Sequence, residues 1–368
     1  GVSFLEEVMG ACLLQGYAQV LSALRNGARV AVVGYSLWRG GGLSLETLVW
    51  AEALIALCSW LLAQALVSRW ARRSPSAPGA LAGFHAADMQ AVARKFYVVQ
   101  LAGQSYGINV TKMLVMRLLG AVEVASFGVA QSVADMVRNY MPAHLLAGWV
   151  RPMMVARYVQ RRDIEEVAAI VNLVFKLNLI CLLPMAAGFF IAGDELMDWL
   201  SKGHYPGVGL LLAVMMLGLV LQTLHLLLTM VALTLESARA SLQGTFAACL
   251  ALPVLVLLIW RFGTLGAALA MLVTELIWIG VAWATLSAQG HRLRFDFRAW
   301  GKIALATVAA ALVSHWVKWD GPTGLVVALA ALGLSFLALL LVLRPQTDTE
   351  IQLLRQLFKR RQTTVKQA

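Results

Sequence analysis

The stretch GINVTKMLVMRLLGAVEVASFGVAQSVADMVRNYMP, residues 107–142, places charged side chains inside runs that are otherwise apolar. It lies within a region, 92–183, whose apolar runs predict three consecutive membrane-spanning helices. A charge at bilayer depth costs about 3 kcal/mol on insertion scales, so such a residue normally faces a polar cavity or a partner. The charged residues in or at the end of these predicted helices are Lys112, Arg117, Asp135, Arg138 and Lys176.

The polar residues of this region recur at helical spacing. Asn109 and Lys112 are three residues apart, and Asn172 and Lys176 are four apart, so each pair lies on one face of its helix. Three neighbouring helices could therefore line one wet and mostly cationic cavity. The residues that we expect to bind substrate in it are Lys112, Arg138, Lys176, Asn109, Asn139 and Asn172.

Three carboxylates in predicted spans each have two interpretations. Asp135 lies three residues before Arg138 and either neutralises it or takes part in coupling. Glu275 lies deep in its predicted span, and Glu52 lies in an early one. Because protonation keeps a carboxylate neutral in an apolar site, either could carry a coupling proton, and a hydrogen-bonded structural role is the alternative. His225 is expected to be a packed, hydrogen-bonded residue and not a proton relay.

The composition of the 368-residue chain is that of a polytopic membrane protein. Hydrophobic residues make up 60% and charged residues 13%, whereas soluble domains have about 25% charged residues. Membrane topology explains the formal net charge of +11, so we expect no nucleic-acid partner. The four cysteines lack zinc spacing, and no nucleotide-binding or nucleophile motif occurs. We therefore expect no metal, no cofactor and no enzymatic activity.

The apolar runs predict about eleven membrane-spanning helices. They lie at 8–24, 27–38, 44–67, 92–116, 121–146, 167–191, 207–234, 240–260, 264–286, 301–317 and 323–343. Most connections are short. The exception is 68–91, whose Pro, Ser, Gly and Arg content marks a linker between two groups of helices.

Lysine and arginine concentrate in alternate connections of this map. The bias places the linker 68–91, the loop 147–166 and the basic tail 344–368 in the cytoplasm. The tail is either a surface helix on an anionic leaflet or a solvated basic segment. We therefore expect a multi-pass protein of the bacterial cytoplasmic (inner) membrane.

Four segments follow the order of motifs in a known transporter family. KMLVMRLLGAVEVASFGVAQSVADMV (112–137) is similar to the end of that family's seventh helix, its Leu-Gly turn and its eighth helix. WVRPMMVARYVQRRD (149–163) is similar to the cytoplasmic segment that follows. LPMAAGFFIAGDELMDWLSKGHYPGVGLLL (183–212) and FGTLGAALAMLVTELIW (262–278) are similar to the ninth-to-tenth helix connection and the start of the twelfth helix. Over 92–343 the chain thus resembles polysaccharide flippases of the multidrug/oligosaccharidyl-lipid/polysaccharide exporter superfamily.

The resemblance implies an all-helical membrane bundle of two lobes. Residues 1–67 would end the first lobe, 68–91 would be a cytoplasmic linker, 92–286 a second lobe of six helices, 287–343 two additional helices, and 344–368 a basic cytoplasmic tail. About three helices of the first lobe would precede Gly1 on this pattern.

The resemblance also implies the substrate class. Members of the family move oligosaccharides linked to undecaprenyl pyrophosphate from the cytoplasmic to the outer leaflet, with a proton or sodium as the coupling ion. The implied partners are this lipid-linked oligosaccharide, membrane lipids and other polysaccharide-assembly membrane proteins. A diphosphate is multiply negative, so burying it requires cationic side chains, which agrees with the predicted cavity.

Two alternative functions remain open. A multidrug or cation antiporter of the same superfamily would favour an acidic, aromatic-rich cavity, whereas bases outnumber acids among the predicted intramembrane residues of 92–183. A membrane polymerase, ligase or glycosyltransferase acting on sugar lipids would present a sizeable external loop. The longest external segment expected here is 192–206.

Overall fold

The computed structural model describes residues 9, 15–38, 44–73, 86–161, 163–203, 205, 207–316 and 321–345. These residues form helices and the turns between them, with no strand in the ranges given. The chain divides into two compact units, Gly1–His85 and Ala86–Ala368, and the division falls inside the expected linker 68–91. Residues 74–85 of that linker, and the tail after 345, lie outside the described residues.

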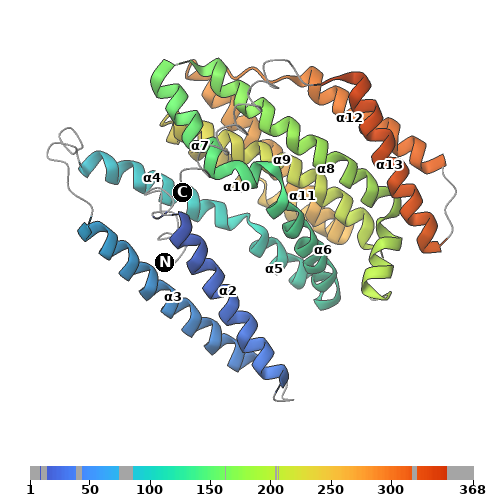
Figure 1. The fold of residues 1–368 in the computed structure, drawn as a ribbon, viewed down its shortest axis with the longest axis horizontal. Helices are drawn as coiled ribbons and strands as arrows, with labels where there is room; N and C mark the ends of the chain where they lie inside the picture. The colour runs from blue at the N-terminus through green and yellow to red at the C-terminus, as the bar shows by residue number, and fades with distance from the viewer. Residues whose placement is uncertain are drawn as a thin grey trace, which may run out of the picture. The chain divides into compact units, whose positions relative to one another are not determined.

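The described residues of the first unit lie mainly in two antiparallel helices (Figure 1). They are α2, Gln15–Trp38, and α3, Leu45–Arg73. Leu21 of α2 and Ala63 of α3 belong to one buried apolar cluster. Most other apolar side chains of the two helices are exposed within the unit, as expected for helices that contact lipid.

Helix α2 corrects one expectation. The spans 8–24 and 27–38 were predicted to be separate, whereas one helix runs through Arg25 and Gly27. Arginine is a good helix former, and a single glycine costs only about 1 kcal/mol in a helix, so this polar segment does not break the helix. Arg25 therefore lies within a helix and not in a connection between two helices.

The second unit begins with four helices separated by sharp breaks. They are α4, Ala86–Ser105; α5, Ile108–Leu119; α6, Ala121–Tyr140; and α7, Pro142–Arg161. The predicted span 92–116 is broken at Gly107, which has φ −69° and ψ 171°. Gly120 has φ +100°, a value that glycine tolerates, and allows the chain to reverse between α5 and α6. Met141 is extended, as the residue before a proline prefers.

Helix α7 corrects a second expectation. The segment 147–166 was predicted to be a loop, but residues up to Arg161 are helical. Val150 and Met154 are four residues apart and buried on one face of α7, where they join the main apolar core. This buried face stabilises a helix whose other side is basic.

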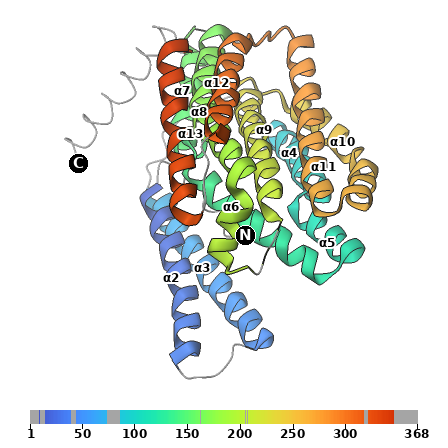
Figure 2. The same cartoon turned by 90° about the vertical axis from the view of Figure 1, so that its right-hand side faces the viewer.

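Two long helices run side by side through the second unit (Figures 1 and 2). They are α8, Ile164–Ser201, and α9, Val208–Thr234. Asp163 caps α8 by accepting a hydrogen bond from the Glu165 amide at 2.8 Å. At the other end of α8 the two helices meet closely, because a Cβ added to Gly193 would lie 2.6 Å from the Cα of Gly209. The Gly209 amide also donates to the Asp194 carboxylate at 2.8 Å.

A short helix and a folded-back helix follow. They are α10, Ala238–Cys249, and α11, Leu252–Ala288. Gly263 has φ 62° and ψ −139°, so the chain reverses direction inside α11. The reversal brings Gly266 against Leu258, where an added Cβ would lie 1.9 Å from the carbonyl oxygen. Its position agrees with the predicted boundary between the spans 240–260 and 264–286.

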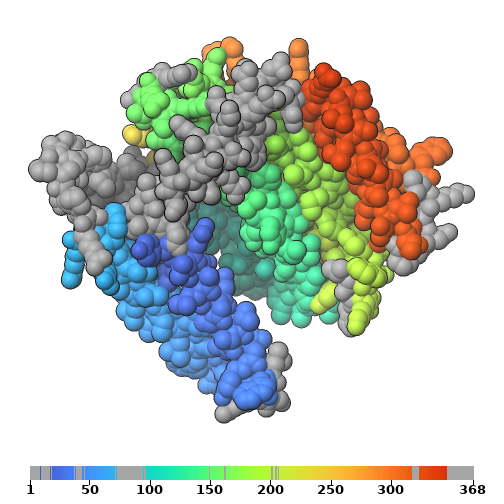
Figure 3. Space-filling view, in the orientation of Figure 1, coloured from blue at the N-terminus to red at the C-terminus, as the bar shows by residue number. Residues whose placement is uncertain are grey.

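The last two described helices form a hairpin against α8. They are α12, Phe297–Trp316, and α13, Gly321–Leu343. Figure 3 shows α13 on the surface of the second unit, with a long exposed face. Val326, Leu334 and Leu341 of α13 are exposed apolar residues, which fits contact with hydrocarbon.

Six helices are long and apolar enough to cross a membrane, judged by length and composition among the described residues. They are Glu46–Trp70, Ile164–Trp199, Val208–Thr234, Leu252–Ala288, Phe297–Trp316 and Thr323–Leu343. The remaining helices are shorter or more polar, which fits a bundle in which some helices face a polar environment.

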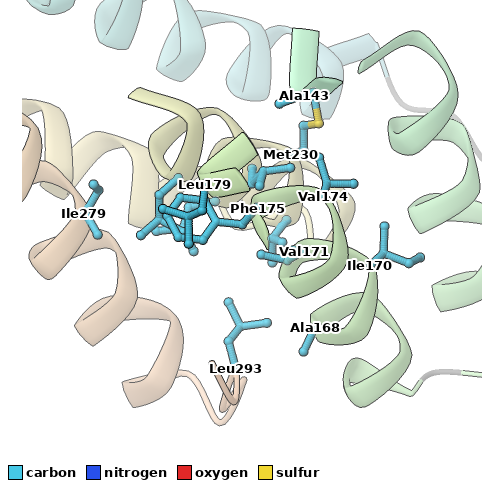
Figure 4. Packing of buried hydrophobic residues seen from close by; sticks show 14 of the residues in the cluster. Ala143, Ala168, Ile170, Val171, Val174, Phe175, Leu179, Met230, Ile279 and Leu293 are labelled. Atoms are coloured by element: carbon cyan, nitrogen blue, oxygen red, sulfur yellow. The ribbon is translucent and has the colours of Figure 1, made fainter. Parts of the chain in front are cut away.

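The largest buried core of the second unit surrounds α8 and α9. Figure 4 shows Val171, Phe175 and Leu179 of α8 packed near Met230 of α9. Phe175 also meets Trp300 of α12 edge to face, with ring centroids 4.5 Å apart. Helix α8 is therefore fixed in the middle of the unit, and polar residues on it must find partners within the protein.

Candidate functional site

Lys176 and Asn172, which were expected to face a substrate cavity, contact the connection between α11 and α12. Only 1% of Lys176 is exposed, and its Nζ lies 2.6 Å from Oδ2 of Asp296. Nζ also donates to the Pro345 carbonyl at 3.4 Å. Asn172 donates to the Arg294 carbonyl at 2.8 Å and accepts from the Asp296 amide at 3.0 Å. This setting differs from the predicted wet cavity, and it ties α8 to the segments before α12 and after α13.

Asp296 is the acidic partner in this contact. Burial raises the pKa of its carboxyl, but hydrogen bonds from Lys176 and the Ala299 amide, and the charges of Lys176 and Lys302, outweigh burial and lower the pKa. Asp296 therefore remains ionised over the physiological range and neutralises the buried ammonium.

Asp135 and Arg138 pair with each other on α6. Arg138 lies 2.8 Å from Oδ1 of Asp135, and Gln131 donates to the same oxygen at 2.9 Å. Both charged side chains are more than one third exposed, so the pair is accessible to water. Asn139 follows on the same helix and is exposed. The neutralising interpretation of Asp135 accordingly has a geometric basis.

Lys112 differs from the other two cations. It lies half-buried on α5, one turn after the break at Gly107, and Asn109 on the same helix is exposed. No carboxylate among the described residues lies within ion-pair distance of Lys112. A half-buried ammonium without a carboxylate is a candidate ligand for a substrate anion.

The structure does not bring the three cations onto one point. Lys112 and Arg138 lie on the two arms of the α5–α6 hairpin, 8 and 18 residues from Gly120. A rise of 1.5 Å per residue puts them about 15 Å apart along the hairpin. Lys176 is engaged with Asp296 on another element.

Glu52 belongs to an ion pair inside the first unit. Its Oε1 lies 2.8 Å from Nε of Arg29, and its Oε2 accepts from the same guanidinium at 3.0 Å. This bidentate contact links α3 to α2. It provides a structural role for a carboxylate that was also considered as a proton carrier.

A polar cluster that the sequence did not predict as a unit lies among α9, α10 and α11. Nδ1 of His225 lies 2.7 Å from Oε2 of Glu275. The His225 ring stacks on Trp278, with centroids 3.5 Å apart and planes 13° from parallel. Trp278 Nε1 donates to the buried Thr245 hydroxyl at 3.2 Å, and Cys249 of the same helix, α10, lies 3.3 Å from the Ser105 hydroxyl at the end of α4.

His225 and Glu275 are 50 residues apart in the sequence, and each lies alone in an apolar run. Only the packing of α9 against α11 places them together, so local pattern could not predict the pair. In the described part of the chain, no group of three or more His, Cys, Asp or Glu side chains could hold a metal ion. Among the described residues the cluster pairs an acid with a base, and no nucleophilic side chain hydrogen-bonds to that base.

Comparison with known proteins identifies a structural neighbour. No family model matches the sequence. No curated protein matches it either. Among solved structures, the chain is similar to the lipid II flippase MurJ in an inward closed conformation, with a TM-score of 0.62 and 13% sequence identity. The match covers 92% of this chain and 70% of the flippase. The predicted fold class is confirmed, because the chain has the polytopic helical membrane fold of this flippase.

Proposed function

We propose that this chain is a transporter that flips an undecaprenyl-pyrophosphate-linked oligosaccharide, a polysaccharide precursor, across the bacterial inner membrane. The observation that carries the proposal is the fold, which is shared with a flippase of another lipid-linked sugar over 92% of the chain. Such a transporter needs no covalent chemistry, because alternate opening of two lobes carries the polar head group across while the lipid tail stays in the bilayer.

The second part of the proposal assigns regions to the transport cycle. Residues 1–67 end the first lobe, 92–286 form the second lobe and 287–343 provide two additional helices. The linker 68–91 and the tail 344–368 are cytoplasmic, because basic residues concentrate there. Membrane lipids, a coupling ion and other polysaccharide-assembly proteins are the expected partners.

Lys112 is the residue that we assign to the pyrophosphate. Its half-buried position on α5 leaves the ammonium accessible, while partial exclusion of water strengthens its attraction for phosphate oxygens. Arg138 is a weaker candidate, because Asp135 already neutralises it. Asn109 and Asn139 are exposed polar side chains that suit sugar hydroxyls. Lys176 and Asn172 are not part of this set.

The assignment is tested by binding undecaprenyl pyrophosphate to the protein in nanodiscs. A charge-assisted contact contributes about 1.5–3 kcal/mol, so Lys112→Ala should weaken binding roughly tenfold to a hundredfold. Lys112→Arg should retain part of the affinity, because the charge matters before its geometry. Arg117→Ala is the matched control, since Arg117 is an exposed cation on the same helix.

The function itself is tested by flipping of the same lipid carrying one N-acetylglucosamine in proteoliposomes. Transport by wild type and by Arg117→Ala, with loss in Lys112→Ala, is the expected result. Failure of wild type to move the probe, together with transport of organic cations, would replace the proposal with the multidrug antiporter.

A further inference from the structure

We propose that His225 and Glu275 form a proton-binding site that couples proton uptake to the bend between α4 and α5. The inference deepens the proposed function, on which it rests for the identity of the cargo. The proton site itself follows from the geometry of the second unit. Its components are a hydrogen-bonded acid and base at 2.7 Å, a stacked indole and a polar connection to a helix break.

The charge balance of the pair favours exchange of one proton. Neutral imidazole beside a carboxylate carries a net charge of −1. One added proton gives either imidazolium with carboxylate or imidazole with carboxylic acid, and both states are neutral. The side chains of His225 and Glu275 are 26% and 17% exposed, so water reaches them but does not fully solvate the charged state. A net charge in such a site is costly, and taking up a proton removes it.

No charged group on the surrounding helices, among the described residues, forms an ion pair that would neutralise the net negative charge of His225 and Glu275. Tyr106 at the α4–α5 break and Cys249 on α10 are the titratable groups next to the cluster. Helix α5 brings Lys112, which is not within ion-pair distance of Glu275, and neither His144 of α7 nor Cys181 of α8 hydrogen-bonds to the pair. Three cations on the helices packed against α9 have their own carboxylates: Arg138 with Asp135, Arg157 with Glu166, and Lys176 with Asp296. Arg151 of α7, Arg239 of α10 and Arg261 of α11 have no carboxylate at ion-pair distance among the described residues, so none of them pairs with Glu275.

A short polar chain connects the pair to the break before α5. The Trp278 ring stacks on His225, and an imidazolium in this position is attracted to the indole face. The Trp278 N–H donates to Thr245 of α10, and α10 packs against α4 next to the break, where Cys249 Sγ lies 3.3 Å from the Ser105 hydroxyl. Tyr106 immediately precedes the non-helical Gly107, where α5 begins. A change in how His225 holds Trp278 therefore reaches the helix that carries Lys112.

Two buried hydroxyls lie on one side of the cluster. Thr229 is one helical turn beyond His225 on α9, and Ser241 is one turn before Thr245 on α10. Both lie toward the turn that joins α9 to α10, and both hydroxyl oxygens are buried without a protein partner. Buried hydroxyls of this kind are satisfied by ordered water.

The proton site is tested without any substrate, by tryptophan fluorescence in nanodiscs titrated between about pH 4 and 9. An imidazolium stacked on an indole quenches its emission, so wild type should show a quenching transition on acidification. Trp278→Phe and His225→Gln should abolish this transition, whereas Trp260→Phe, which removes an exposed tryptophan, should retain it. His225→Gln keeps a hydrogen-bonding partner for Glu275, which protects the fold.

Glu275→Gln provides the decisive comparison. The variant removes the acidic partner of His225 and should therefore change the midpoint of the quenching transition. Glu46→Gln, in the first turn of α3, is the matched control and should leave the midpoint unchanged. A transition that survives in Trp278→Phe, or a midpoint that Glu275→Gln does not move, would overturn the proton site.

Coupling is then measured as flipping of the N-acetylglucosamine lipid under an imposed pH gradient in proteoliposomes. The gradient should accelerate wild type and Glu46→Gln but not Glu275→Gln. Equal acceleration of all three would refute the coupling role. If no variant moves the lipid, the proposed function fails, while the fluorescence titration still decides whether His225 and Glu275 bind a proton.

Discussion

The contact between Lys176 and Asp296 should respond very differently to removal of its two partners. The ammonium is buried, with 2% of the side chain exposed, whereas 35% of the Asp296 side chain is exposed. Asp296→Asn leaves a buried cation without its carboxylate. Lys176→Met instead leaves a carboxylate that still reaches water and still accepts from the Ala299 amide at 3.1 Å.

The magnitudes follow from this asymmetry. Removing one partner of a buried ion pair costs about 3–5 kcal/mol. The Pro345 carbonyl still accepts from Lys176 Nζ and water partly reaches residue 296, which places Asp296→Asn at the lower end, about 3 kcal/mol. Asparagine preserves the oxygen that caps α12, so loss of the cap adds little. Lys176→Met fills the same volume with an apolar chain and should cost about 1 kcal/mol or less. The double variant should resemble Lys176→Met, since it has no buried charge.

The free energy of unfolding of all four proteins can be compared by steric trapping in detergent micelles. The expected order of stability is wild type, then Lys176→Met and the double variant together, then Asp296→Asn about 2 kcal/mol below them. Equal losses in the two single variants would show that the buried ammonium has another compensation of similar strength. A double variant less stable than Asp296→Asn would refute the reasoning.

Two further predictions concern stability. Gly266→Ala should destabilise the protein by about 3 kcal/mol or more, because the added Cβ would lie 1.9 Å from the Leu258 carbonyl oxygen. Gly280→Ala is the control and should be neutral or stabilising, because the space around Gly280 is open. Similar melting temperatures for the two variants would contradict the reversal at Gly263. The second prediction concerns pH and rests on the lowered pKa of Asp296. The ionised carboxylate stabilises the folded protein fully above the pKa of an unfolded aspartate, about 4, and this stabilisation is lost as the pH falls through the lower pKa of the folded protein. The melting temperature of wild type should therefore drop more steeply on acidification than that of Asp296→Asn.

Helix boundaries could be predicted where the chain itself forces a break. Gly263 ends one predicted span and precedes the next because only a residue without a side chain adopts its backbone angles easily. At Met141 the predicted span 121–146 was wrong, because the residue before a proline is extended and α6 ends there. The polar segment around Gly27 contains no such constraint, and a loop was wrongly predicted there. The helical segment 147–161 was predicted to be a loop because its buried face is narrow and its charged face is prominent.

The candidate site was harder to predict because depth in a helix does not specify what a side chain contacts. A charge in an apolar run indicates that some compensation exists, but Lys176, Arg138 and Lys112 are compensated in three ways. Lys176 meets a carboxylate 120 residues away, and Arg138 meets one on its own helix. For Lys112 the described residues offer no carboxylate at ion-pair distance. A substrate phosphate would supply the negative charge that Lys112 lacks. We therefore assign substrate binding to Lys112 and not to Lys176, although Lys176 is more deeply buried.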